Sequence, residues 1–158
     1  MGQLVNFFWT ILCFAPVVYY WLKADALTMC WYLIAVSFLS LLIPSGWLQL
    51  SQNPKFYVKA GARFIRKFVQ NGDWFKNDTP VISNRFGAMQ YKATIIMYER
   101  FHFLCLVFFI LTSIYALIHQ QYVIALLVFL ANMIYNVCPI ILQQYNFSRL
   151  LNIGKRML

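Results

Sequence analysis

The chain alternates between long stretches that hold no charged side chain and short stretches that hold all of its charges. No Asp, Glu, Lys or Arg falls in residues 1–22, 26–54 or 101–148. A membrane-spanning helix needs about 20 predominantly apolar residues. The first two stretches therefore predict one span each, and the third predicts two, separated by the polar turn His119-Gln120-Gln121. The pattern indicates an all-α membrane protein with four transmembrane helices.

We expect these spans within a single membrane domain, residues 1–158, at about 3–22, 28–50, 101–118 and 122–144. The loop 51–100 and the tail 145–158 then lie on the same side of the membrane as the N-terminus. All but one of the 13 Lys and Arg residues fall on that side, and Lys23 is the exception. Because Lys and Arg concentrate in cytoplasmic loops, we expect a multi-pass cell-membrane protein with both termini in the cytoplasm.

The start of the central loop, residues 55–69, has a helical period and a basic flank. The residues that recur on one helical face are Tyr57, Gly61, Phe64, Ile65 and Phe68. A basic amphipathic helix beside a span lies in the headgroup plane, so we expect an interfacial helix between spans two and three. The same basic surface would attract a phosphate-bearing acyl carrier, and the sequence does not separate the two roles. Residues 72–90 look irregular, and a helical pattern over 89–100 runs into span three.

The composition supports this membrane assignment. Hydrophobic residues make up 62% of the chain and charged residues 11%, against roughly 45–50% and about 25% in an average soluble domain. A chain of 158 residues could not bury so much apolar surface in one water-soluble core. The net charge of +9 would suggest nucleic acid in a soluble protein. Here cytoplasmic loops that meet anionic lipids explain it better, so we expect membrane lipids and no nucleic acid as partners.

Two ionisable residues, Glu99 and His102, stand at the cytoplasmic entrance of span three. Their i,i+3 spacing places both side chains on one helical face. A carboxylate beside an imidazole can fix its tautomer and raise its basicity, as a general base requires. A structural role is the alternative, with Glu99 paired with a basic neighbour such as Lys92 and His102 acting as a polar residue at the headgroup boundary.

Span four carries an unusual stripe of amides. Asn132, Asn136 and Gln143 share one helical face at i, i+4 and i+11, and Pro139 lies on the same stripe. Amides in lipid need hydrogen-bond partners. The stripe therefore either joins neighbouring helices or lines a polar cleft that admits a substrate headgroup, and the sequence leaves both interpretations open.

Each of the four cysteines falls inside a predicted span, and no C-x-x-C motif is present; they are Cys13, Cys30, Cys105 and Cys138. We interpret them as small buried hydrophobic side chains. His102 and Cys105 share a helical face, but two ligands do not make a zinc site. The sequence therefore predicts no metal site and no resident cofactor.

Two segments resemble a known family. Residues 136–150, Asn-Val-Cys-Pro-Ile-Ile-Leu-Gln-Gln-Tyr-Asn-Phe-Ser-Arg-Leu, resemble the C-terminal signature of the glycosyl-4,4'-diaponeurosporenoate acyltransferases, and Glu99-Arg100-Phe101-His102 resembles that family's E-x-x-H motif. The resemblance covers mainly residues 55–156. Two positions depart from the family pattern, because Gln144 and Phe147 stand where the family has Arg.

The resemblance implies a small integral membrane acyltransferase that moves a fatty acyl group onto a sugar hydroxyl of a glycosylated carotenoid. It implies acyl-CoA or an acyl-carrier protein as the donor and a lipid-like acceptor. It also implies catalytic roles for Glu99 and His102. The tail residues that match the family's motif, which we take as substrate-binding candidates, are Asn136, Gln143, Tyr145, Asn146 and Arg149.

Two hypotheses of different class follow. In the first, the protein acylates a hydroxyl of a glycolipid or glycosylated isoprenoid at the cytoplasmic face. His102 is then the general base and Glu99 orients it, while Asn136 or Arg149 stabilises the oxyanion or holds the donor. In the second, the protein is a non-catalytic scaffold or accessory subunit whose amides and aromatic residues are packing surface. A transporter is disfavoured because no span holds a charged residue near its middle. An oligomer within the membrane stays open.

Overall fold

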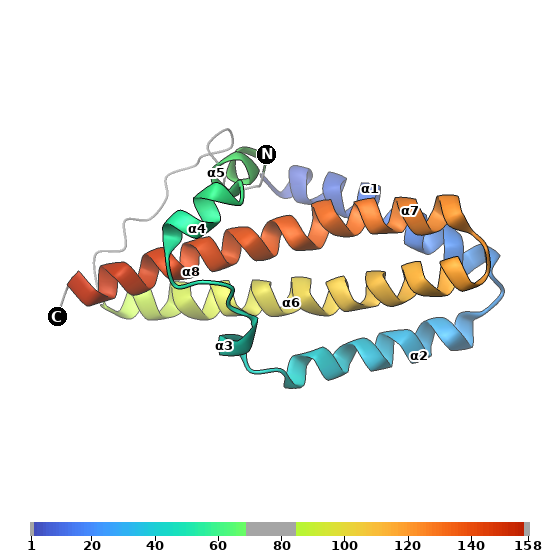
Figure 1. Ribbon diagram of the computed structural model, residues 1–158, viewed down its shortest axis with the longest axis horizontal. Coiled ribbons are helices and arrows are strands. Elements are labelled where there is room, and N and C mark those ends of the chain that lie inside the picture. Colours follow the sequence, from blue (N-terminus) through green and yellow to red (C-terminus); the bar gives the residue numbers. More distant parts are fainter. Residues whose placement is uncertain (1, 69–84, 157–158) are drawn as a thin grey trace.

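The computed structural model describes residues 2–68 and 85–156, which form helices and contain no strand (Figure 1). The long helical segments are α1 (Gly2–Lys23), α2 (Leu27–Phe38) with its extension η1 (Leu39–Leu42), α6 (Arg85–Ile118), α7 (Tyr122–Asn132), the π-helical turn η3 (Met133–Val137) and α8 (Cys138–Arg156). The short ones are α3 (Ser45–Leu48), α4 (Pro54–Lys59), α5 (Ala62–Ile65) and η2 (Arg66–Phe68). The predicted all-α class is confirmed for these residues.

Helix α6 is the centre of the arrangement. It packs against α2 and against the continuous rod formed by α7, η3 and α8, while α1 packs against α7 and η3. The turn between α1 and α2 and the turn between α6 and α7 lie at one end of the bundle, far from the C-terminus and from α3 to α5 (Figure 1). The second of these turns begins after Ile118 and ends at Tyr122, as the polar tripeptide His119-Gln120-Gln121 predicts.

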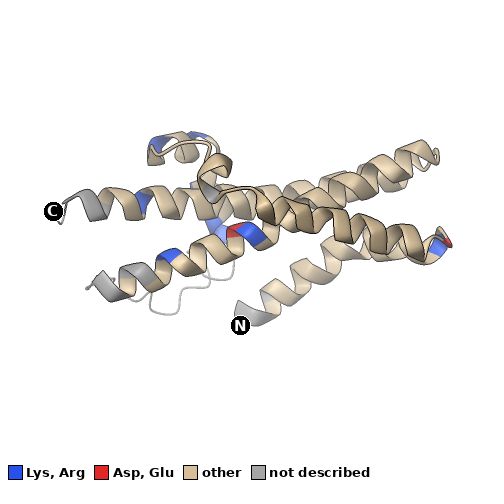
Figure 2. Cartoon of the chain, turned by 90° about the horizontal axis from the view of Figure 1, so that it is seen from below, with Lys and Arg blue, Asp and Glu red and all other residues tan. Residues whose placement is uncertain are grey.

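Charges are concentrated toward the end of the bundle that holds the C-terminus. In Figure 2 the charged residues lie between the C-terminus and the middle of the bundle, and beyond the middle the next charges are those of the α1–α2 turn at the opposite end. Two helical segments, Gln90–Ile118 and Tyr122–Asn152, are long and apolar enough to cross a membrane. The four-span topology and its cytoplasmic orientation stay predictions.

The core of the bundle joins α1 to α6 and α7 through aromatic and small side chains. Phe14 meets Phe109 edge to face at 5.0 Å between ring centroids, and Trp21 stacks on Tyr115 at 5.2 Å. The Trp21 indole N–H donates to the Thr112 hydroxyl over 3.3 Å. All four cysteines are free thiols that are buried or half-buried, in agreement with their interpretation as small hydrophobic side chains.

The helix of the predicted span 28–50 is shorter than the span, and it ends just before Pro44, the proline that interrupts this stretch of the sequence. The helix ends at Leu42, giving a mainly apolar helix of 16 residues over Leu27–Leu42, or about 24 Å at 1.5 Å per residue. Pro44 forces the preceding residue out of the helical region, and Ile43 is extended at φ −72° and ψ 124°. The Leu41 carbonyl, left without a helical donor, accepts a hydrogen bond from the Arg100 guanidinium at 2.6 Å.

The predicted interfacial helix over 55–69 is also interrupted. Its first part, α4, ends at Lys59, and α5 begins after Gly61, which adopts a left-handed φ of +89°. A glycine in this conformation stops an α-helix. Tyr57 is fully buried, but Phe64, expected on the same face, is exposed. The side chain of Phe68 and residue 69 lie outside the described part of the chain.

Helix α6 begins at Arg85, so the irregular structure expected over 72–90 is wrong for its last six residues. The remainder of that prediction, up to residue 84, lies outside the described residues. The helical pattern over 89–100 is confirmed, because α6 runs without a break from there through His102.

The break at Gly61 generates a stability prediction. We expect Gly61→Ala to lower the free energy of unfolding by about 1 kcal/mol, because a Cβ is strained at positive φ. A Cβ built at Gly61 meets no atom within 4 Å, so the cost comes from the backbone alone. In detergent, the unfolding midpoint should fall by about 2–4 °C.

Gly46→Ala is the matched control. A Cβ built at Gly46 also meets no atom within 4 Å, but Gly46 has no positive φ and lies within α3. Its unfolding midpoint should stay constant or rise slightly. Equal midpoints for the two variants would contradict the assignment of Gly61 as the residue that separates α4 from α5.

Candidate functional site

Polar side chains form a line where α6 faces the α7–η3–α8 rod, and we call this line the polar ladder: Glu99 and His102 of α6 with Asn132, Asn136 and Gln144. Asn132 donates to the Leu106 carbonyl over 3.2 Å, and Asn136 donates to the Asn132 side-chain oxygen over 2.8 Å. Asn132, Asn136 and Gln144 are buried. Asn132 and Asn136, two members of the predicted amide stripe, therefore lie inside the bundle, and Asn132 bonds to the neighbouring helix α6.

His102 is the titratable side chain at the middle of the polar ladder. Its Nδ1 lies 3.4 Å from the Asn136 Oδ1. The Asn136 amide nitrogen already donates to Asn132, so the atom that faces the imidazole is an acceptor and Nδ1 must carry the hydrogen. In the neutral ring the proton-accepting nitrogen is then Nε2. A general base needs its imidazole held in one tautomer, and here the Asn136 side-chain amide does this.

The π-helical turn places Asn136 opposite His102. A proline two residues further along, Pro139, has no N–H to donate, so the helical pattern is disturbed in the preceding turn. There the chain widens into η3, and Cys138 bonds back five residues to the Met133 carbonyl. π-helical turns of this kind occur frequently at functional sites. The ring of Tyr135, also in η3, packs edge-on against His102 at 5.5 Å.

Glu99 is hydrogen-bonded to Gln144 at the end of the polar ladder that is farther from Asn132. The Gln144 Nε2 donates to a Glu99 carboxylate oxygen and to the Leu48 carbonyl, each over 2.7 Å. Its Oε1 accepts from the Leu50 N–H over 3.2 Å. Glu99 is 6% exposed and Gln144 is 2% exposed. A single buried amide thus connects α6, α8 and the segment that joins α3 to α4.

Tyr57 of α4 completes this junction. Its hydroxyl accepts from the Ser51 N–H at 2.8 Å, donates to the Ser51 carbonyl at 2.7 Å and lies 3.2 Å from the Gln144 Oε1. Burial raises the pKa of Tyr57, against the opposing effect of the Ser51 main chain, and the Glu99 carboxylate raises it further. The hydroxyl therefore stays protonated, and α4 is held against α8 by an uncharged group.

The structure does not pair Glu99 with His102. Although the two share a face of α6, Glu99 binds Gln144 and His102 binds Asn136. The expectation that Glu99 orients the imidazole directly is therefore wrong, and Asn136 occupies that role. Lys92, the basic neighbour given as an example in the structural alternative for Glu99, stands over the Phe147 ring at 5.7 Å.

The glutamine that joins the site is Gln144, whereas the sequence predicts its neighbour Gln143. Gln143 is half-buried and makes no side-chain hydrogen bond within the ranges that the structure describes, whereas its neighbour Gln144 joins the junction. An uninterrupted α-helix would bring Gln143 onto the face of Asn136, since 7 residues are close to two turns. One extra residue in the π-helical turn η3 rotates α8 by about 100°, and Gln144 takes that place.

The remaining tail residues lie farther along α8. Tyr145 is buried with Tyr57, Ala62 and Leu142 where α4 and α5 pack on α8. The Arg149 guanidinium is 5.6 Å from the Tyr145 ring centroid. Arg149 is exposed and Asn146 half-buried. Thirteen residues separate Arg149 from Asn136, about 20 Å of helix, so the two cannot hold the same atom of a substrate.

Comparison with known proteins supplies an independent finding. The family model described as glycosyl-4,4'-diaponeurosporenoate acyltransferase matches residues 44–156. The match spans α3 to α8 and includes every residue of the polar ladder, whereas α1 and α2 precede it. No curated protein and no solved structure matched the chain.

The junction at Gln144 predicts that two adjacent glutamines differ in importance. Gln144→Leu leaves the Glu99 carboxylate and the Leu48 and Leu50 main-chain groups without their partner. Each buried group left unpaired costs about 1–3 kcal/mol, so the unfolding midpoint in detergent should fall sharply. Gln143→Leu, one residue away, should leave it nearly unchanged. Equal losses would argue against the junction.

Proposed function

The chain belongs to the glycosyl-4,4'-diaponeurosporenoate acyltransferase family, and we propose that it transfers a fatty acyl group to a hydroxyl of a glycolipid or glycosylated isoprenoid at the cytoplasmic face of the membrane. The donor is a phosphopantetheine thioester, either acyl-CoA or an acyl-carrier protein. The observation that carries the proposal is the pairing of His102 with Asn136 inside the segment that matches the family.

In this proposal His102 Nε2 is the general base. It removes the proton from the acceptor hydroxyl as the oxygen attacks the thioester carbonyl carbon. A new C–O bond forms, the C–S bond breaks, and the imidazolium returns the proton to the departing thiolate. The products are an ester and a free thiol. Asn136 holds the hydrogen on Nδ1 and so keeps Nε2 available throughout.

Glu99 supports this reaction at a distance in the proposal. Residues at i and i+3 on a helix have Cβ atoms about 5–6 Å apart, so an ionised Glu99 would stabilise the imidazolium by its charge without touching it. Gln144 holds the carboxylate in place through its 2.7 Å hydrogen bond. Glu99 is therefore a positioning and electrostatic residue, and His102 is the group that contacts the reacting hydroxyl.

The distance between Asn136 and Arg149 along the rod implies that the two residues contact different parts of the substrates. Arg149 lies about 20 Å along the helix from Asn136, so it is too far away to stabilise an oxyanion beside His102. It suits a phosphate at the far end of the elongated phosphopantetheine arm instead. The exposed basic residues of α4, α5 and η2 add to the same attraction; they are Lys55, Lys59, Arg63 and Lys67.

The scaffold hypothesis is favoured by one observation. Every amide of the polar ladder finds a partner within the bundle, as expected of side chains that only hold helices together. The two hypotheses differ at His102, because loss of its ring removes a base but leaves the Asn132–Asn136 hydrogen bond intact.

The chain's two histidines provide a matched test of the base. We expect His102→Ala to reduce acyl transfer about 10²–10⁴-fold, the usual contribution of a general base. The acceptor mixture is a lipid extract from the source cells, and mass spectrometry counts new acyl esters in membranes that contain equal amounts of each variant. His119→Ala changes an exposed residue of the α6–α7 turn and should keep full activity.

Asn136→Ala separates orientation from proton transfer. It leaves the ring in place with its Tyr135 main-chain hydrogen bond and removes only the side-chain acceptor at Nδ1, so activity should fall less than in His102→Ala. Unchanged activity in His102→Ala would overturn the assignment of the base. Absence of any acyl ester with the unaltered protein, combined with normal folding, would instead support the scaffold hypothesis.

A further inference from the structure

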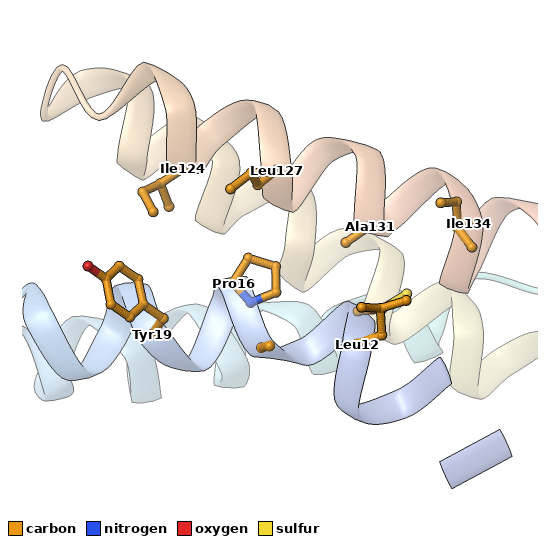
Figure 3. Close-up of a pocket in the computed structure, with 9 residues that line it drawn as sticks. Leu12, Pro16, Tyr19, Ile124, Leu127, Ala131 and Ile134 are labelled. Carbon is orange, nitrogen blue, oxygen red and sulfur yellow. The ribbon is translucent and has the colours of Figure 1, made fainter. Parts of the chain in front are cut away.

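An apolar groove runs along the seam between α1 and α7 (Figure 3). Its volume is about 430 Å³, within the usual range of roughly 300–1,000 Å³ for ligand sites. The α1 side is formed by Leu12, Cys13, Ala15, Pro16 and Tyr19, and the other side by Ile124, Leu127, Ala131 and Ile134. The Tyr19 hydroxyl is the sole side-chain oxygen among these residues.

The groove has a buried floor and an open side. Cys13 and Ala131, which are small, are buried, whereas Leu12, Tyr19, Leu127 and Ile134 are each about half exposed. Small floor residues give the groove its depth, and the larger side chains form its walls. An elongated apolar group could therefore enter sideways from surrounding lipid without passing through water.

The length of the groove matches one acyl chain. Ile124 and Ile134 mark its two ends on the α7–η3 rod, and 10 residues of helix span about 15 Å. The hydrocarbon core of a bilayer is about 30 Å thick and holds two leaflets, so a single lipid chain also extends about 15 Å. A longer polyisoprenoid would extend well beyond both ends.

One end of the groove, at Ile134, is next in sequence to a residue that contacts the polar ladder. Next to Ile134 is Tyr135, which packs against His102 at 5.5 Å and against Phe14 of α1 at 5.2 Å. The Tyr135 hydroxyl lies 3.0 Å from the Thr10 Oγ1. The Thr10 hydroxyl donates to the Asn6 carbonyl, so Tyr135 is the donor of that bond. Tyr135 does not itself line the groove, but it follows the lining residue Ile134 and its ring contacts the candidate base.

We propose that the α1–α7 groove binds the hydrocarbon chain of the acyl thioester donor. The chain lies with its thioester end toward Tyr135 and His102 and its methyl end toward Tyr19 and Ile124. The inference rests on the proposed function and names the subsite that the donor uses. Ile124 and Tyr19 close the outer end, and they set the longest chain that fits.

The α1 wall of this groove lies outside the residues that match the family, which begin at residue 44. Half of the subsite is therefore contributed by a segment that the family match does not include. Chain-length preference then depends on Tyr19 of α1 together with Ile124 of the matched segment, whereas the base belongs to the matched segment alone.

The first test measures the preference between lauroyl-CoA and palmitoyl-CoA. Ile124→Trp shortens the groove and should shift the ratio of kcat/KM toward lauroyl-CoA by at least about tenfold, the scale on which apolar pockets discriminate chain length. Tyr19→Ala opens the outer end and should shift the ratio the opposite way. Val123→Trp places the same bulk on an exposed neighbour that does not line the groove, and its ratio should not change.

The second test needs no turnover. A palmitoyl-CoA analogue with a diazirine on its terminal carbon should label α1 and α7 near Tyr19 and Ile124, as read by peptide mass spectrometry. Excess palmitoyl-CoA should suppress the labelling, and Ile124→Trp should reduce it severalfold relative to Val123→Trp. A phosphatidylcholine analogue with the same diazirine tests occupancy by bulk lipid.

The two tests separate failure of the groove from failure of the proposed function. Competed labelling without acyl transfer would retain the groove as an acyl-chain site and overturn the transferase. Transfer with an unchanged chain-length ratio in both Ile124→Trp and Tyr19→Ala would overturn the groove alone. Equal labelling by the phosphatidylcholine probe, without competition by palmitoyl-CoA, would show a crevice filled by bulk lipid and would also overturn it.

Discussion

The buried carboxylate of Glu99 determines how the chain packs at one end of the molecule. Burying a polar or ionised group without partners is costly, and Glu99 meets that requirement through Gln144 of α8. The amide then has its own remaining groups to satisfy, and the main chain at Leu48 and Leu50 does so. The chain after Pro44 must therefore turn back toward the bundle, and Tyr57 seals α4 against α8. Helix packing, loop path and interfacial segment all depend on one hydrogen-bonded junction.

The same helix pair positions the candidate chemistry. His102 and Glu99 lie one turn apart on α6, but the rod opposite offers them different amides because η3 changes its helical phase between Asn136 and Gln144. The imidazole thus has a neutral neighbour that orients it, and the carboxylate has a neutral neighbour that holds it. In the proposed reaction the amide keeps the ring in one tautomer, and the carboxylate acts on the imidazolium by its charge alone.

Much of this arrangement can be predicted from residue types. The remainder depends on the rotation of one helical segment relative to the next and on the local backbone conformation. Charge-free stretches identify the long helices, and rare polar residues such as His102 and Asn136 identify the polar ladder. Pro44 marks the end of the second long helix in the sequence itself, whereas the local effect of Gly61 outweighs the periodic pattern that suggested one helix over 55–69. The choice of Gln144 over Gln143 requires knowledge of the π-helical turn, which periodicity at 3.6 residues does not contain.

The partners of Gln144 at the loop are a carbonyl and an N–H of the main chain rather than side chains. Every residue offers a carbonyl, and every residue except proline offers an N–H. Related chains can therefore differ in side-chain identity at Leu48 and Leu50 and still keep this junction, with proline excluded at position 50. Evolutionary drift can thus erase all sequence similarity in the loop while its path across the bundle stays the same. An alignment of related chains would accordingly show little covariation between positions 48 or 50 and Gln144, although the Gln144 side chain bonds to the main chain at both positions.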